Sequence, residues 1–102
     1  VNNGFGVTGV AYNSTIMPVR VLGPNGGTAA GVAAGIVYAV NNGADVINLS
    51  LGGVGGPDSA TAVASDNAAL LGTTVVASAG NSGPGEGTVG APAAGRHVIA
   101  VG

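Results

Sequence analysis

Short apolar runs alternate with helix-like segments along this chain, and that alternation limits its possible folds more than any other feature. Four runs have the length of a strand: residues 16–22, 46–51, 74–79 and 97–101. They carry few polar residues, as expected for strands covered on both faces. Strands linked by helices pair in parallel, because the connection must cross the sheet. We therefore predict an α/β fold, a three-layer parallel sheet with helices on both faces.

A helix is predicted over residues 28–42. Val32, Ile36 and Val40 are spaced four apart, so they lie on one helical face. Gly43 follows as a residue typical of the position just after a helix.

A second helix is predicted over residues 58–71. Asp58 is the candidate N-cap, since its carboxylate can accept from the first backbone amides, and Gly72 ends the segment. In the first apolar run, Pro18 has no N–H, so its donor side should not face a partner strand.

Composition excludes several classes of function. Only 6% of residues are charged, there is no lysine, and the net charge is −2. We expect no nucleic-acid or membrane partner, because both need clustered basic residues. The absence of cysteine excludes disulfides and thiol nucleophiles, and the single His97 excludes a multi-histidine metal site within the chain. The 21 glycines leave little side-chain area to bury, which suggests a piece of a larger domain.

Two glycine-rich segments partly resemble phosphate-binding motifs. Residues 4–9 read GFGVTG, but no strand precedes them and no helix follows directly, as the dinucleotide fingerprint requires. Residues 52–56 follow a predicted strand but lack the Lys-Ser/Thr of a P-loop. We interpret both as turn-rich loops and expect no organic cofactor.

Acid–base chemistry has no complete set of residues here. The carboxylates show no spacing typical of an acid–base pair; they are Asp45, Asp58, Asp66 and Glu86. His97 has no nearby Asp or Ser, and no G-x-S-x-G motif occurs. We interpret His97 as a structural or surface residue.

Asn81 comes just after the third apolar run. The reactive crevice of a parallel sheet lies outside the carboxyl ends of its strands. A carboxamide there is a neutral donor that can point at a developing oxyanion. A turn asparagine fits the local sequence as well, so both interpretations stay open on these residues alone.

The chain resembles the subtilisin-like serine proteases over essentially its whole length. Phrases similar to that family occur in the family's order and near its spacing: NNGFGVTGVA at 2–11, PVRVLG at 18–23, NGADVINLSLGG at 42–53, VVASAGNSG at 75–83, TVGAP at 88–92 and VIAVG at 98–102. The resemblance implies an endopeptidase that acts on peptide or protein substrates by acyl transfer.

The resemblance also implies roles for individual residues. Asn81 matches the family's oxyanion-hole asparagine. Two further groups match the strand edge that pairs with the substrate backbone, Ser50, Leu51 and Gly52, and the lining of the pocket for the residue before the scissile bond, Ala79, Gly80 and Gly90. Ala91 replaces a family aromatic at the pocket mouth, and its bond to Pro92 is expected to be cis. Gly52 and Asn81 should lie at the same end of the sheet.

The family's catalytic Asp and its HGTHVAG segment would precede Val1, and its GTSMAxP segment would follow Gly102. We therefore expect residues 1–102 to be the central segment of one incomplete, secreted peptidase domain, inactive without the remaining parts of that domain. The alternative is a non-catalytic scaffold or peptide-binding fragment that keeps the pairing groove.

A structural calcium ion is the one cofactor that the resemblance implies. Residues 1–7 are similar to a calcium loop, in which the Asn3 side chain and the carbonyls of Val1, Phe5 and Val7 would be the ligands. Such oxygen ligands suit calcium.

Overall fold

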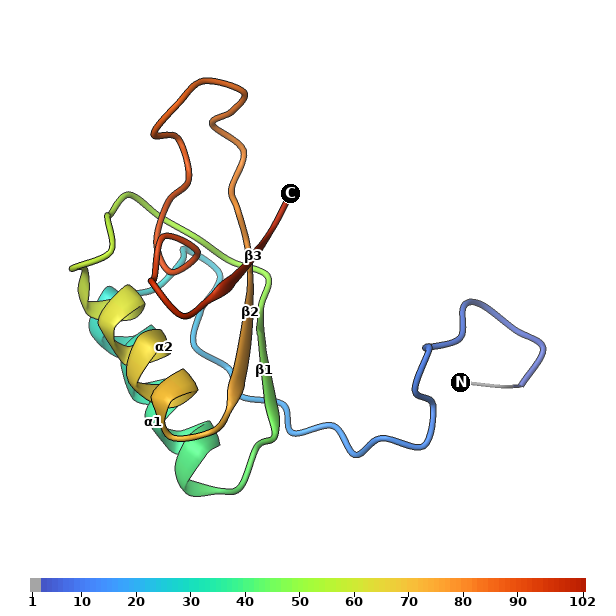
Figure 1. Cartoon of the computed structure of the whole chain (residues 1–102). Helices are drawn as coiled ribbons and strands as arrows, with labels where there is room; N and C mark the ends of the chain where they lie inside the picture. Colours follow the sequence, from blue (N-terminus) through green and yellow to red (C-terminus); the bar gives the residue numbers. More distant parts are fainter. Residues whose placement is uncertain (1–2) are drawn as a thin grey trace.

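The computed structural model describes residues 3–102, in which two helices pack against a three-stranded parallel sheet (Figure 1). The elements are α1 (Ala29–Asn41), β1 (Val46–Leu49), α2 (Ala60–Leu70), β2 (Thr74–Ser78) and β3 (Ile99–Val101). The sheet order is β1-β2-β3, and both pairs are parallel. The predicted α/β class with a parallel sheet is confirmed.

Helix α1 has the predicted position, and it is one residue shorter than predicted at each end, where Thr28 and Asn42 are its caps. The Thr28 side chain accepts a hydrogen bond from the N–H of Gly31 at 3.0 Å, which satisfies one of the free amides of the first turn. After the helix, Gly43 has a φ of +82°, a left-handed conformation that glycine adopts without strain.

Helix α2 begins two residues later than predicted. Ser59 occupies the N-cap position, and its hydroxyl makes no capping hydrogen bond. The prediction that Asp58 caps this helix is therefore wrong: its carboxylate instead accepts a hydrogen bond from Arg96 Nη1 at 3.0 Å. The attraction of a guanidinium that comes from a distant part of the chain was not visible in the local sequence.

The predicted first strand, residues 16–22, is not a strand in this structure. Val19 and Val21 are half-buried, and Val21 packs against the core near α1. A cavity of about 680 Å³ is lined jointly by this segment, α1 and β1. Strand pairing needs a neighbouring backbone roughly 4.8 Å away, and the described residues provide none here.

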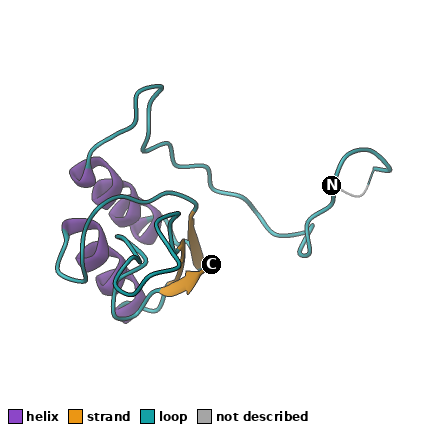
Figure 2. Ribbon diagram, turned by 90° about the horizontal axis from the view of Figure 1, so that it is seen from above, coloured by secondary structure: helices purple, strands orange, loops and turns teal. Residues whose placement is uncertain are grey.

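Both helices lie on the same face of the sheet, as Figure 2 shows. Burial alternates along β1 and β2, so that Ile47, Leu49, Val75 and Ala77 point into the core beneath the helices. Among the described residues, no helix covers the other face, so the three-layer arrangement is represented by two layers. Apolar side chains on β1 and β3 remain exposed: Val46 at 61%, Ile99 at 53% and Val101 at 50%.

Residues 3–15 extend away from the helices and the sheet (blue in Figure 1) and are exposed throughout. Neither α1 nor α2 has the length and hydrophobicity that a helix needs to span a membrane, and the described residues contain no other α-helix.

Candidate functional site

The segments after β1 and β2 leave the sheet at the same edge. The two strands are parallel and in register from Val46 opposite Thr74 to Leu49 opposite Ala77. Gly52 and Asn81 therefore both lie beyond the carboxyl ends of their strands, as predicted. In an open parallel sheet this edge is where ligands bind.

Hydrogen bonds join three segments at this edge, residues 51–53, 78–80 and 90–91, which we call the loop assembly. The Ser78 hydroxyl donates to the carbonyl of Leu51 at 3.2 Å. Gly53 and Ala91 exchange two backbone hydrogen bonds, of 3.0 and 3.1 Å, in an isolated antiparallel bridge. The N–H of Gly90 donates to the carbonyl of Ala79 at 3.4 Å. The residues expected to bind substrate are thus brought together from positions up to 40 residues apart.

Two glycines of this assembly have a clear steric reason to be glycine. A Cβ at Gly90 would lie 2.5 Å from the carbonyl oxygen of Gly53, closer than real Cβ atoms approach a backbone atom. Gly80 has a φ of +98° and open space around its Cα, so no side chain fills the volume beside it. The peptide bond between Ala91 and Pro92 is cis, as expected.

The strand edge at residues 50–52 has free backbone groups. Gly52 forms no backbone hydrogen bond with any of residues 3–102, and the Ser50 hydroxyl accepts one from Asn48 Nδ2 at 3.0 Å. Leu51 is half-buried and packs against the core, which fixes the position of this edge. An extended peptide could pair with Gly52 through its main chain.

Asn81 is exposed, directly after the left-handed Gly80. Its carboxamide forms no hydrogen bond with the part of the chain that the structure describes, so both of its N–H groups are available to an external acceptor. A turn asparagine usually bonds to nearby backbone, and this one does not.

The titratable groups do not form a catalytic set within residues 3–102. Asp45 and Glu86 are exposed; Asp45 directly precedes β1, at the opposite end of the strand from these loops, and Glu86 lies in the loop between Ala79 and Gly90. No group of three or more His, Cys, Asp or Glu side chains could hold a metal ion in the described part of the chain. His97 is exposed, and it is its backbone N–H, not its imidazole, that donates to the Asp66 carboxylate.

Asp66 has a role that the sequence interpretation missed. Its carboxylate is buried, with 8% of the residue exposed, and accepts backbone hydrogen bonds from Arg96 and His97. One signal was present in the sequence: Asp66 lies one helical turn after Ala62, on the same face of the predicted helix.

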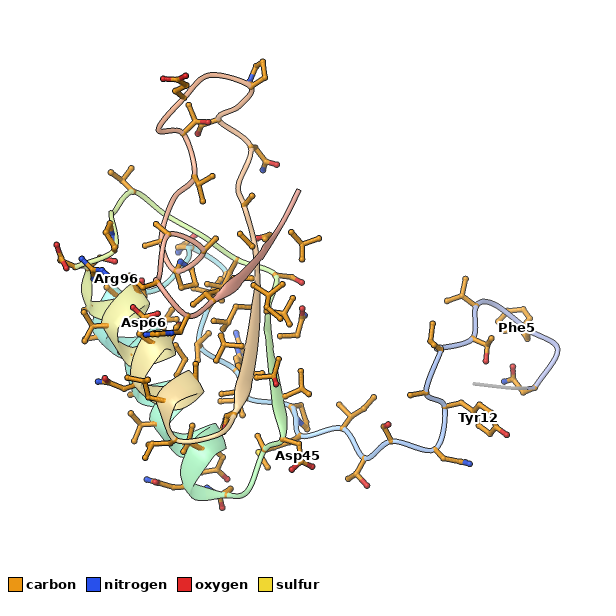
Figure 3. All side chains as sticks on the ribbon, in the orientation of Figure 1. Phe5, Tyr12, Asp45, Asp66 and Arg96 are labelled. Carbon is orange, nitrogen blue, oxygen red and sulfur yellow. The ribbon has the colours of Figure 1, made fainter. Side chains whose placement is uncertain are left out.

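The expected calcium ligands only partly fit that ion. Val1 lies outside the described residues. Asn3 Oδ1 accepts a hydrogen bond from the N–H of Phe5 at 3.1 Å, in an exposed turn far from the sheet (Figure 3). Calcium takes roughly 6–8 oxygen ligands, usually including carboxylates. One amide oxygen and three backbone carbonyls fall short of that number, so these four residues do not form a calcium site by themselves.

Comparison with known proteins identifies the family. The model of the "Subtilase family" matches residues 1–102. The minor extracellular protease Vpr of Bacillus subtilis (strain 168) is 50% identical over 98 residues, which cover 94% of this chain and 12% of Vpr. Subtilisin DY of Bacillus licheniformis is 46% identical over 107 residues, covering 100% of this chain and 38% of that protein.

The fold comparison agrees. The solved structure of a protease from Pseudoalteromonas arctica PAMC 21717 matches 97% of this chain and 32% of its own, with a TM-score of 0.83 and 42% identity. The chain thus spans less than two fifths of the length of each of these relatives. The match of the family model over the whole chain and the likeness in sequence and fold together show that this chain belongs to the subtilase family.

Proposed function

We propose that this chain is the central segment of a secreted, subtilisin-like serine endopeptidase and contributes its substrate-binding edge and one oxyanion donor. The observation that carries the proposal is the loop assembly at the carboxyl edge of the sheet, in which Leu51, Gly53, Ala79, Gly90 and Ala91 are joined by hydrogen bonds. Secretion is supported by relatives whose names describe extracellular proteases.

In this proposal the substrate binds as an added strand. Its backbone pairs with residues 50–52, where Gly52 has unpaired main-chain groups. The side chain before the scissile bond enters the space lined by Ala79, Gly80 and Gly90. Gly80 lacks a Cβ and has open space beside its Cα, which leaves room there for a substrate side chain, whereas the position of a Cβ at Gly90 is occupied by the carbonyl of Gly53.

Asn81 acts after the nucleophile attacks. A serine hydroxyl from another segment of the domain gives its proton to the general base as its oxygen forms a bond to the scissile carbonyl carbon, and the π electron pair moves onto the carbonyl oxygen. The carboxamide of Asn81 donates a hydrogen bond to that oxyanion. The oxyanion then collapses, the amine leaves with a proton from the general acid, and water hydrolyses the acyl-enzyme.

The remaining parts of the peptidase domain supply the Ser, His and Asp. They also account for the exposed apolar side chains of Val46, Ile99 and Val101, which lie on the sheet face that the two helices leave open. An open apolar face of this kind is typical of a surface that other segments cover.

The test is hydrolysis of chromogenic peptides by the complete protein in which this chain occurs. We expect turnover that a serine-directed inhibitor abolishes. Binding of the same peptides without cleavage would favour the alternative, a non-catalytic scaffold or peptide-binding fragment, and would overturn the proposal.

A further inference from the structure

We propose that Asp66 is a positioning residue that sets substrate preference from helix α2, by holding the loop that forms one wall of the substrate pocket. The inference rests on the proposed function for the meaning of that pocket. Asp66 itself does not belong to the loop assembly, and its effect would be transmitted through residues 90–97.

The first observation is the use of both carboxylate oxygens. Asp66 Oδ1 accepts from the N–H of His97 at 2.7 Å, and Oδ2 accepts from the N–H of Arg96 at 3.1 Å. Figure 3 shows Asp66 and Arg96 side by side, where α2 meets the C-terminal loop. Hydrogen bonds to a charged acceptor are stronger than neutral ones, and burial increases their strength.

The second observation is the close approach of the loop to this carboxylate. A Cβ at Gly95 would lie 2.9 Å from Asp66 Oδ1 and 2.7 Å from Val98 Cγ2. A residue with a Cβ at this position would force the carboxylate, the Val98 side chain or the loop to shift. Two features therefore set the position of the loop: the hydrogen bonds that Asp66 accepts and the absence of a side chain at Gly95.

The third observation is a continuous path from this contact to the pocket wall. The N–H of Gly95 donates to the carbonyl of Pro92 at 2.9 Å, and the N–H of Ala94 donates to the carbonyl of Gly90 at 2.9 Å. Pro92 is fully buried and Ala93 is part of the core. Gly90 is thus linked to the Asp66 anchor by one compact turn.

The ion pair between Arg96 and Asp58 offers an internal comparison. It joins the same loop to the start of α2, but its side chains are 59% and 84% exposed. Exposed pairs contribute little, because water and salt screen them. Asp58→Asn is therefore a matched control: it removes a carboxylate that contacts the loop without touching the buried anchor.

The experiment uses the complete peptidase with Asp66→Asn, Asp66→Ala and Asp58→Asn. Asparagine keeps the size of aspartate but turns one acceptor into an NH₂ group that faces an N–H donor. One readout is hydrogen exchange at the amides of Arg96 and His97. The other is the ratio of kcat/KM for substrates with a large or a small side chain before the scissile bond, normalised to titrated active sites.

For Asp66→Asn we expect amide exchange to accelerate at least about tenfold and the substrate ratio to shift at least about fivefold, because small displacements of a binding wall alter rates strongly. Asp66→Ala should show larger changes, and Asp58→Asn should keep both quantities within about twofold of the parent. If neither Asp66 variant folds, Gly95→Ala is the test, because its added Cβ disturbs the same contact from the loop. We expect it to accelerate amide exchange and to shift the substrate ratio as well.

Faster exchange with an unchanged substrate ratio would make Asp66 a purely structural residue and overturn the inference. Unchanged exchange would overturn it as well. A parent protein that hydrolyses no peptide would instead contradict the proposed function, and the exchange data would still tell whether Asp66 holds the loop.

Discussion

At the scale of single residues, replacing Asn81 is expected to lower the turnover rate more than any other substitution discussed. Asn81→Leu keeps the approximate size and removes the proposed donor to the oxyanion. We expect kcat of the complete enzyme to fall roughly 10²–10³-fold with little change in KM, because the hydrogen bond forms mainly in the transition state. Steady-state kinetics normalised to active-site titration measure this. A kcat within about threefold of the parent would remove Asn81 from the mechanism.

Gly90 is the residue whose replacement should disturb the loop assembly most directly. Its Cβ would meet the carbonyl oxygen of Gly53 at 2.5 Å, so Gly90→Ala should lower the free energy of unfolding by about 1–3 kcal/mol. Gly53→Ala is the control, since open space surrounds that position, and it should change the free energy by under about 1 kcal/mol. Equal effects of both variants in chemical denaturation would contradict the steric explanation.

At the scale of elements, the two helices begin differently although both have a hydroxyl residue at the N-cap. Thr28 bonds to the N–H of Gly31, whereas the Ser59 hydroxyl is buried without a partner among the described residues. The two caps therefore contribute unequally to helix stability.

This difference can be measured with a pair of alanine variants. Thr28→Ala should lower the free energy of unfolding by about 1 kcal/mol, because it removes the capping hydrogen bond. Ser59→Ala should leave it unchanged or raise it slightly, since it removes an unsatisfied buried hydroxyl. Denaturant titration of both variants measures the two free energies of unfolding. A larger decrease for Ser59→Ala than for Thr28→Ala would refute this explanation.

At the scale of the whole molecule, the proposed binding edge is accompanied by no catalytic set of side chains among residues 3–102. We expect purified residues 1–102 to hydrolyse no peptide, because an oxyanion donor without a nucleophile and a base adds only to binding. A chromogenic peptide assay checks this. Hydrolysis by the isolated chain that a serine-directed inhibitor abolishes would show that a nucleophile lies within it.

The sequence by itself determined the features that depend on near neighbours. The spacing of Val32 and Ile36 placed α1, and Gly43 marked its end, because helix periodicity and the left-handed conformation are local properties. The alternation of apolar runs and helices also determined the parallel sheet, and with it the common edge of Gly52 and Asn81.

Tertiary structure alone decided what depends on distant partners. Residues 16–22 have the composition of a strand but, within residues 3–102, no neighbouring backbone with which to pair, and pairing, unlike helix formation, requires a second segment. Asp58 and Asp66 look alike in the sequence, yet one is in an exposed ion pair and the other is a buried anchor. That difference arises because residues thirty or more positions away bring their N–H groups and charge to each carboxylate, which no local pattern encodes.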